Sequence, residues 1–289
     1  MPKRSGVARR GRGARYAEWV ARSPDATLAH EGDKARVFAV ACRAGRRDRP
    51  YPETHVDYTV ALVRRGTFQY RSSADDTRHD VREGWVITGR PGAAFECGHD
   101  HDHGDDCVAM HVSPELVEDV ASQVVKRGSV PFGTAVHGPS TRVAALVASL
   151  DAGADVDETL YDVVAATIAG ETRETPQPIG EERANRRRVE RALEKIEAAS
   201  HQRIALGDLA KEAGLSPFHF LRLFRAMTGT TPKQYLVGAR LRRAARLLVE
   251  TELPVTRVAY DVGFEDVSNF VRTFHREVGV SPGAFRKSR

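Results

Sequence analysis

The side chains best suited to hold a metal ion are concentrated in residues 97–107. This segment reads CGHDHDHGDDC, with Cys97 and Cys107 at its ends and His99, His101 and His103 between them, next to four carboxylates. Zinc takes tetrahedral nitrogen and sulfur ligands, so the two thiols and two of the three imidazoles form a candidate zinc site. The spacing matches no standard zinc module. A solvated hairpin tip and a thiol pair that senses oxidants are the alternatives.

A second candidate metal-binding set lies between residues 55 and 99 and would have to face into a β-barrel. His55-Val56-Asp57 precedes Gly66, and Gly84, Pro91-Gly92 and His99 follow. This order is similar to the two motifs of cupin metalloenzymes, which need two or three imidazoles and a carboxylate on separate hairpins, but Asp57 stands where a second histidine belongs. Because the set is degenerate, and P-loop, H-E-x-x-H and G-x-S-x-G patterns do not occur, we expect no enzyme.

The C-terminal half contains an internal repeat at an offset of fifty residues. Each unit is predicted to consist of a short helix, a turn with glycine and a longer helix, which is the pattern of a helix-turn-helix. The first unit carries Phe220, Arg222, Phe224, Gly229, Pro232 and Tyr235, and the second carries Phe270, Arg272, Phe274, Gly279, Pro282 and Phe285.

The longer helix of each unit has one face to bury and one face suited to DNA. Phe220, Leu223, Phe224 and Met227 have the i, i+3, i+4, i+7 spacing of a buried face, and Phe270, Phe274 and Val278 repeat it. The opposite faces mix arginine, asparagine, serine and apolar groups, which can recognise guanine, adenine and the thymine methyl group in a major groove. These outward residues are Phe218, Leu221, Arg222 and Arg225 in the first unit and Ser268, Asn269, Arg272, His275 and Arg276 in the second.

A single helix from Pro232 to about Thr251 is predicted to join the two units. Its roughly 20 residues would span ~30 Å. The longer helices of the two units, here called the reading helices, could therefore lie about one duplex turn, ~34 Å, apart. The positive N-terminal end of each reading helix would face phosphate. Helix-turn-helix geometry also occurs in bundles that bind only protein, and in that alternative the exposed arginines are simply solvated.

Residues 204–286 resemble the tandem helix-turn-helix domain of the AraC/XylS family of bacterial transcription regulators. The second unit reads AYDVGFEDVSNFVRTFHREVGVSPGAFR, close to the family signature, and Arg240, Leu241, Ala244, Leu247 and Leu248 fit the pattern of its linker helix.

The resemblance implies one set of base-reading residues in each unit. Phe218, Leu221 and Arg222 would read one major-groove segment, and Val267, Ser268 and Arg272 the next. Val267 and Ser268 stand where relatives often have longer polar side chains. The family often places a small cupin-type β-barrel with helices, which binds an effector or dimerises, ahead of this domain. Residues 37–170 look like that arrangement.

The N-terminal half changes its hydrophobic period near Pro114. Short alternating or β-branched runs at 37–42, 58–63, 67–71, 85–88 and 108–112 predict an antiparallel sandwich or barrel. Beyond Pro114, spacings of three and four predict amphipathic helices around 116–124, 143–150 and 160–168, with starts at Ser113-Pro114 and Pro139-Ser140. The predicted fold class is α+β: an N-terminal cupin-like β-barrel with packed helices, and an all-α C-terminal domain of two helix-turn-helix units joined by a long helix.

Charge divides the chain in the same way. The 289 residues are 41% hydrophobic, enough for two ordinary domains. Residues 181–289 hold 21 basic and 13 acidic side chains, a net charge of +8, whereas residues 1–180 have a net charge of −3. We expect a disordered basic arm at 1–15, a cupin-like sensor or dimerisation domain at 16–172, a linker at 173–182 and the tandem helix-turn-helix domain at 183–289. The arm could contact phosphates or be a solvated tail.

Composition also indicates where the protein works. The longest apolar run is far short of the ~20 residues that cross a bilayer, and no apolar segment follows the basic arm as in a secretory signal. The three cysteines are too few for a disulfide framework, and Cys42 is expected in the core. We expect a cytoplasmic protein with reduced thiols and no membrane partner.

Together these patterns predict a sequence-specific DNA-binding transcription regulator that reads two successive major-groove segments and responds to a signal sensed in the N-terminal domain. The expected partners are double-stranded promoter DNA, RNA polymerase, an unknown small-molecule or metal effector, and a second copy of the chain that contacts helices between 114 and 172. Zinc is the candidate cofactor. The alternative is a cupin-type metalloenzyme, or a zinc or redox sensor module, with an accessory DNA-binding domain.

Overall fold

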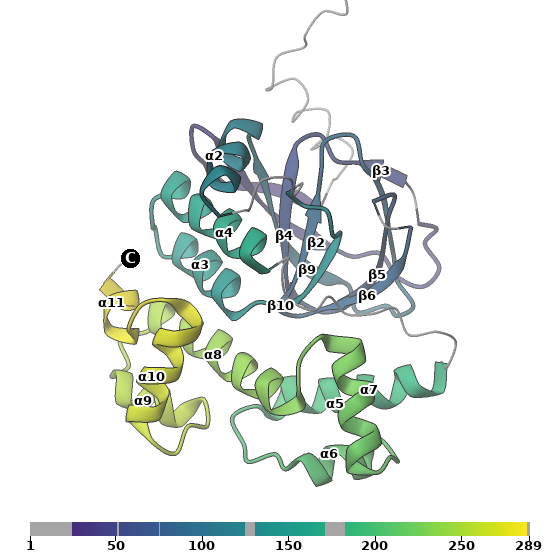
Figure 1. The fold of residues 1–289 in the computed structure, drawn as a ribbon, viewed down its shortest axis with the longest axis vertical. Helices are drawn as coiled ribbons and strands as arrows, with labels where there is room; N and C mark the ends of the chain where they lie inside the picture. The colour runs from purple at the N-terminus through teal and green to yellow at the C-terminus, as the bar shows by residue number, and fades with distance from the viewer. Residues whose placement is uncertain (1–24, 51, 75, 125–130, 171–182, 288–289) are drawn as a thin grey trace, which may run out of the picture.

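The computed structural model describes residues 25–287 apart from 51, 75, 125–130 and 171–182. The predicted basic arm at 1–15 and the predicted linker at 173–182 lie outside these described residues. The described chain has a β-rich N-terminal half with helices and an all-α C-terminal half (Figure 1). The predicted α+β class is confirmed.

The N-terminal half contains two antiparallel sheets. One has six strands in the order β1-β2-β9-β4-β7-β10, and the other has four in the order β3-β8-β5-β6. The runs predicted from alternation form β2, β4, β5, β7 and β9, the inner strands of the six-stranded sheet and one inner strand of the other. The strands are β1 (Ala26–Glu31), β2 (Ala35–Cys42), β3 (Pro52–Thr54), β4 (Tyr58–Arg65), β5 (Thr67–Ser72), β6 (Arg78–Arg82), β7 (Trp85–Gly89), β8 (Ala94–Gly98), β9 (Asp105–Val112) and β10 (Val136–Pro139).

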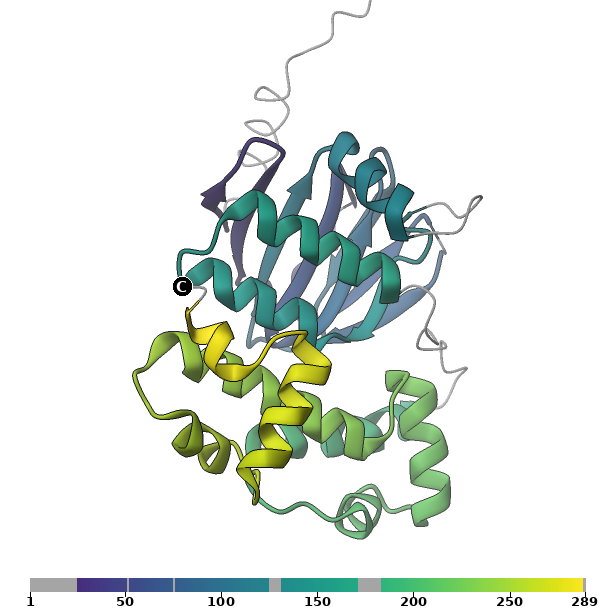
Figure 2. The same ribbon diagram turned by 60° about the vertical axis from the view of Figure 1, so that its left-hand side comes forward.

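Three helices cover one face of the six-stranded sheet, as Figure 2 shows. They are α2 (Pro114–Val124), α3 (Thr141–Asp151) and α4 (Val156–Gly170), so all three predicted helices are confirmed. The two predicted starts are also confirmed: α2 begins at Pro114, and the Ser140 hydroxyl caps α3 by accepting from the Val143 N–H. Fully buried side chains from sheet and helices, among them Val60, Met110 and Leu160, form one core.

The C-terminal half folds around two cores. Its helices are α5 (Arg183–Ala199), α6 (Leu206–Glu212), α7 (Pro217–Thr228), α8 (Pro232–Glu250), α9 (Val255–Asp261), α10 (Val267–Val278) and α11 (Pro282–Lys287). Phe220 and Phe224 lie in the core of the first unit with residues of α5, and Phe270 and Phe274 lie in the core of the second. Helix α8 contributes side chains to both cores, as expected of a joining helix.

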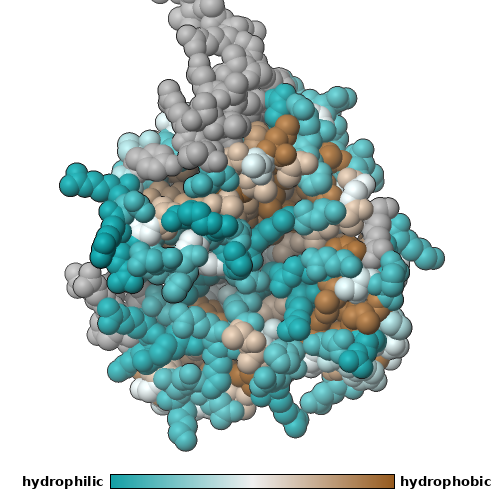
Figure 3. Space-filling view, turned by 180° about the vertical axis from the view of Figure 1, so that it is seen from behind, coloured by the Kyte–Doolittle hydropathy of each residue, from teal (hydrophilic) through white to brown (hydrophobic). Residues whose placement is uncertain are grey.

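The two halves are in contact along α3 and the β6–β7 turn. Helix α3 packs against α8 and α10, and its fully buried Ala145 belongs to the core of the second unit. Arg82 at the end of β6 forms an ion pair of 3.0 Å with Glu190 of α5. Hydrophilic side chains cover most of the face seen from behind (Figure 3). No helix in the described residues is both long and apolar enough to span a membrane.

Candidate DNA-binding surface

The two predicted reading helices have the same length and the same kind of C-terminal end. Helix α7 begins where the Ser216 hydroxyl accepts a hydrogen bond of 3.3 Å from the His219 N–H, with Pro217 in its first turn. It ends at Gly229, whose φ of +70° suits a residue without a side chain and whose N–H donates to the Arg225 carbonyl at 2.8 Å. Helix α10 ends in the same way at Gly279, with a φ of +98°.

Helix α7 gathers the first predicted set of residues on one exposed face. Phe218, Arg222 and Arg225 are exposed, and Leu221 between them is half-buried. The Phe218 side chain is 78% exposed, which is unusual for a large apolar group and leaves its ring available to a partner. On the opposite face Phe220 and Phe224 are fully buried, so the predicted division of the helix is confirmed.

Helix α10 gathers the second set in the same manner, with one difference. Ser268, Asn269, Arg272 and His275 are exposed in the intact chain. Val267 is half-buried and packs against the core of the second unit, so its side chain is only partly available to DNA. The neighbouring Arg276 is exposed and ion-paired with Glu277 at 2.9 Å.

The N-terminal ends of the two helices differ in charge. At α10 the Asp266 carboxylate accepts hydrogen bonds from the N–H groups of Ser268 at 2.9 Å and Asn269 at 3.1 Å. Because the chain's own anion already occupies these donors, α10 presents little positive potential to a phosphate. The cap of α7 is the neutral Ser216, so the expected phosphate contact fits α7 better than α10.

The opposite ends of both reading helices line a cleft of about 650 Å³ between the halves of the chain. Thr228 comes from the end of α7, and Arg276 and Glu277 come from the end of α10. The facing wall is formed by residues 137–143 and by the last turn of α4. The N-terminal half therefore meets the C-terminal ends of the reading helices and leaves their outward faces exposed.

The predicted zinc-binding residues do not all converge. His99 lies within 2.6 Å of the Asp105 carboxylate, and Cys107 donates to the same carboxylate at 3.4 Å. His101 points elsewhere: its two ring nitrogens contact the Thr67 carbonyl and the His103 N–H, and His103 is exposed. Cys97, Cys107 and Cys42 are free thiols.

Sequence reasoning missed two members of this cluster, Cys42 and Asp105. Their side-chain ligand atoms lie within 4.8 Å of that of His99. The hydrogen bond to Asp105 raises the pKa of His99 to about 9, and burial raises the pKa of the Cys97 and Cys107 thiols. No local sequence signal could have found these residues, because Cys42 becomes a neighbour of Asp105 only through the pairing of β2 with β9.

His55, the first residue of the degenerate cupin set, is built into the protein interior. The two ring nitrogens of His55 contact the Thr59 hydroxyl at 3.2 Å and the Tyr70 hydroxyl at 3.0 Å. Its ring stacks on Phe95 with centroids 4.3 Å apart. Desolvation lowers the pKa of His55 to about 4, so it is neutral at pH 7. This arrangement gives His55 a structural role.

Comparison with known proteins decides the nature of the C-terminal helices. Residues 209–288 match a family model described as a helix-turn-helix domain. The C-terminal part of the chain is an AraC-type helix-turn-helix domain. This AraC-type domain is 38% identical over 87 residues to the MmsAB operon regulatory protein of Pseudomonas aeruginosa, covering 30% of this chain and 28% of that protein. It is 45% identical over 84 residues to the transcriptional activator NphR of a Rhodococcus species, covering 29% of this chain and 25% of that protein.

Among solved structures, the chain is similar to the DNA-binding domain of the global transcriptional factor AdpA in complex with a target DNA. That similarity has 33% identity and a TM-score of 0.33, and covers 37% of this chain and 93% of the other. ToxT of Vibrio cholerae, solved with a bound unsaturated fatty acid, has 11% identity and a TM-score of 0.37, with coverage of 90% and 97%. The chain thus covers less than a third of the length of MmsAB operon regulatory protein and of NphR, with the match confined to the AraC-type domain.

Proposed function

We propose that this protein is a sequence-specific DNA-binding transcription regulator whose helices α7 and α10 read two successive major-groove segments. The observation that carries the proposal is the pair of helices of equal length in which Arg222 and Arg272 stand at equivalent exposed positions. An arginine so placed can donate two hydrogen bonds to the O6 and N7 atoms of a guanine. Equivalent positions on two helices give the two halves of a bipartite site.

Affinity and sequence choice come from different residues in this proposal. The net charge of +8 in residues 181–289 neutralises phosphates and draws the domain to any duplex, with a strong dependence on salt. Side chains that reach base edges then select the sequence. Phe218 and Leu221 offer apolar contacts that suit a thymine methyl group, and Asn269 offers an amide that suits adenine.

The first test is selection of binding sequences from a random duplex library with the full-length chain. We expect enrichment of a bipartite site with its halves about one helical turn apart. Enrichment of a single short site would remove one reading helix from the proposal. A library that yields no enriched sequence, with the chain folded, would contradict sequence-specific binding.

The second test assigns the arginines. Arg222→Ala and Arg272→Ala should each weaken binding to the selected site by roughly 1–3 kcal/mol and relax the preference in one half only. Arg71→Ala is the matched control, because it removes an exposed arginine from β5 of the N-terminal half. Equal losses on selected and scrambled duplexes, measured by fluorescence anisotropy, would show that the arginine contacts phosphate instead.

The N-terminal half, residues 16–172, is proposed as the part that senses a signal and controls the DNA-binding part, residues 183–289. Support comes from the packing of α3 against α8 and α10, because a shift of α3 would move the helices of the DNA-binding part. An effector acts by favouring one of two arrangements of these parts. RNA polymerase at the promoter is a proposed further partner.

A second copy of the chain is the other proposed partner. Helix α3 is already engaged within the chain, so α2 and α4 are the remaining candidates for a dimer contact among the three helices. Light scattering after size exclusion at several concentrations should give twice the mass of 31.8 kDa. A mass that stays at one chain across the range would contradict the dimer.

A further inference from the structure

Cys42 and Cys107 lie at one end of the six-stranded sheet, although they are far apart in the sequence. Cys42 is the last residue of β2 and is paired with Asp105, the first residue of β9, so their side chains share one face of the sheet. Cys107 lies two residues further along β9 and has the same orientation. Cys97 lies near the end of β8 in the other sheet, with His99 two residues beyond it.

Packing of the two sheets brings His99, which follows β8, close to Cys42 and Asp105 of the six-stranded sheet. One ligand atom from each of Cys42, His99 and Asp105 lies within 4.8 Å of the others. The His99 Nε2 atom is 2.6 Å from Asp105 Oδ2, and the Cys107 sulfur is 3.4 Å from Asp105 Oδ1. Cys97 packs against the buried cluster to which Cys107 belongs. The side chains of His99 and Asp105 are each only 4% exposed.

The segment between His99 and Asp105 is held in place at several points. His101 contacts the Thr67 carbonyl, and the Asp102 carboxylate accepts from the Arg46 N–H at 3.1 Å and pairs with its side chain at 2.8 Å. At Gly104, with a φ of +68°, a Cβ atom would come within 2.5 Å of the Cys42 carbonyl. The positions of His99 and Asp105 relative to Cys42 are therefore fixed by the fold.

We propose that Cys42, His99 and Asp105 bind a zinc ion at this end of the sandwich, with Cys97 and Cys107 beside them as candidates for the fourth ligand. Sulfur, nitrogen and oxygen are the donors that zinc takes in proteins, at about 2.0–2.3 Å, which puts tetrahedral ligand atoms ~3.5 Å apart. The carboxylate makes the set less suited to copper(I), which prefers thiolates and thioethers. A thiol that binds releases its proton to solvent, and the metal offsets the negative charge that remains.

The site differs from the one that the spacing of residues 97–107 predicts. The exposed His103 and the engaged His101 lie outside it, and Cys42 and Asp105 enter it. It also differs from the cupin set, since His55 contacts Tyr70 and Thr59 instead. The zinc proposal does not depend on DNA binding, so each can fail alone.

The test is the metal content of the full-length chain, purified without a histidine tag. Elemental analysis after dialysis should find about one zinc per chain. Cys42→Ser, His99→Gln and Asp105→Asn should each bind zinc at least roughly a hundredfold more weakly. His103→Gln is the matched control, because it removes an exposed imidazole from the same segment, and it should keep its zinc.

A spectroscopic measurement on the wild-type chain covers the case in which a variant does not fold. Cobalt(II) added to metal-free protein should give intense visible bands of a tetrahedral site and a thiolate-to-cobalt band in the near ultraviolet. Wild-type protein with neither zinc nor these bands would overturn the proposal. A loss of metal in His103→Gln that matches the loss in Cys42→Ser would overturn it too, because the ion would then sit on the surface of the loop.

Discussion

Burial makes weak bases of three histidines among the described residues of the N-terminal half. Desolvation lowers the pKa of His55 to about 4, of His111 to about 3 and of His137 to about 4. His137 is only 8% exposed and contacts the Thr88 hydroxyl at 3.1 Å. In the unfolded chain each imidazole returns to a pKa near 6.5. The unfolded state therefore binds more protons than the folded state at pH values between the folded and the unfolded pKa.

This difference predicts that the N-terminal half loses stability in mild acid. The stabilisation is complete above about pH 6.5 and decreases as the pH falls towards 4, because protons favour the unfolded chain. For one such histidine the loss reaches a few kcal/mol. Urea unfolding followed at a series of pH values between 7.5 and 4.5 measures it.

A pair of substitutions isolates the effect. His137→Gln removes one buried titrating group and should flatten part of the pH dependence, whereas His201→Gln removes an exposed imidazole and should leave the dependence unchanged. A stability that does not change between pH 7 and 5 would show that these imidazoles are not held neutral by the fold.

Among the helices, the reading helix α10 is stabilised by its N-cap residue, Asp266. The Asp266 carboxylate satisfies two N–H groups that would otherwise have no helical partner. Asp266→Ala should lower the free energy of unfolding by about 1 kcal/mol. Asp266→Asn keeps an oxygen acceptor and should restore most of the loss. Equal stability of the alanine variant and the wild type in urea would mean that solvent replaces the carboxylate at no cost.

The helices were predictable because they carry strong local signals. The period of the apolar residues and the helix starts at Pro114 and Ser140 all lie within a few residues of the helices they define. These signals, with the repeat, located both reading helices and their exposed faces.

The strands that were not predicted from the sequence lie mainly at the edges of the sheets. β1, β3, β6 and β10 are edge strands, and β1 buries little of its surface. An edge strand lacks a neighbour on one side and needs less apolar surface, so its alternation is weak. β3 and β10 are also only 3 and 4 residues long.

The cluster around His99 escaped for a different reason. Cys42 and Asp105 become neighbours only through the pairing of β2 with β9, and His99 joins them only because the two sheets pack together. Neither strand register nor sheet packing has a local signature in a single sequence. Residues 97–107 could show the right residue types, but not which of them face inward.

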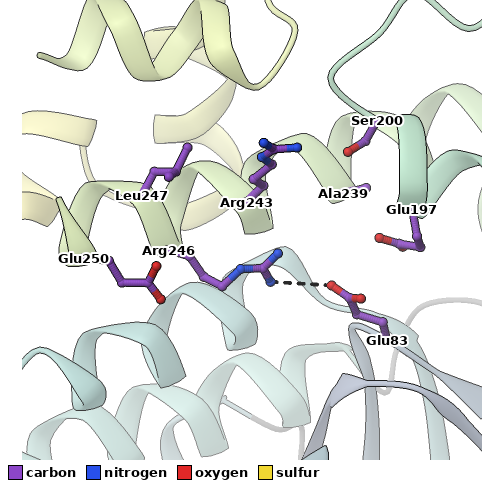
Figure 4. Close-up of a pocket in the computed structure, with 8 residues that line it drawn as sticks. All are labelled: Glu83, Glu197, Ser200, Ala239, Arg243, Arg246, Leu247 and Glu250. Atoms are coloured by element: carbon purple, nitrogen blue, oxygen red, sulfur yellow. Dashed lines mark hydrogen bonds and ion pairs between the residues drawn. The ribbon is translucent and has the colours of Figure 1, made fainter. Parts of the chain in front are cut away.

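Across the whole molecule, the β6–β7 turn holds the C-terminal half through charged groups. Figure 4 shows Glu83 pointing from this turn to Arg246 of α8, 3.5 Å away, across a pocket of about 260 Å³. Burial raises the pKa of Glu83. Next to it, the buried Arg242 of α8 is ion-paired with Glu197 of α5 at 2.5 Å. The turn therefore lies against a guanidinium that is already fixed within the C-terminal half.

Gly84 makes this contact testable. Its φ is +83°, and a Cβ atom there would lie 2.8 Å from the Arg242 guanidinium carbon. Gly84→Ala should strain the turn and also push the two halves apart, because Arg242 is held by Glu197 and cannot move freely. Faster hydrogen exchange of backbone amides in α8 and α5 would report the separation.

Gly92 provides the matched control. Its φ is +85°, but a Cβ atom at this position would meet no atom of another described residue beyond its chain neighbours within 4 Å. Gly92→Ala should cost about the same backbone strain, roughly 1 kcal/mol, and leave exchange in α8 unchanged. Equal exchange in both variants would show that the turn does not hold the C-terminal half.

The exposed faces of α7 and α10, which we propose read DNA, lie apart from the C-terminal ends of these helices, which line the cleft towards the N-terminal half. Positions such as 218, 222 and 272 can therefore change without disturbing Thr228, Arg276 or the contacts of α3. Under the proposed function, lineages that descend from this protein are free to acquire new operators while they keep the same response, and the two base-reading faces can be exchanged together by design. The promoters of such a regulator can then diverge faster than the signal to which it responds.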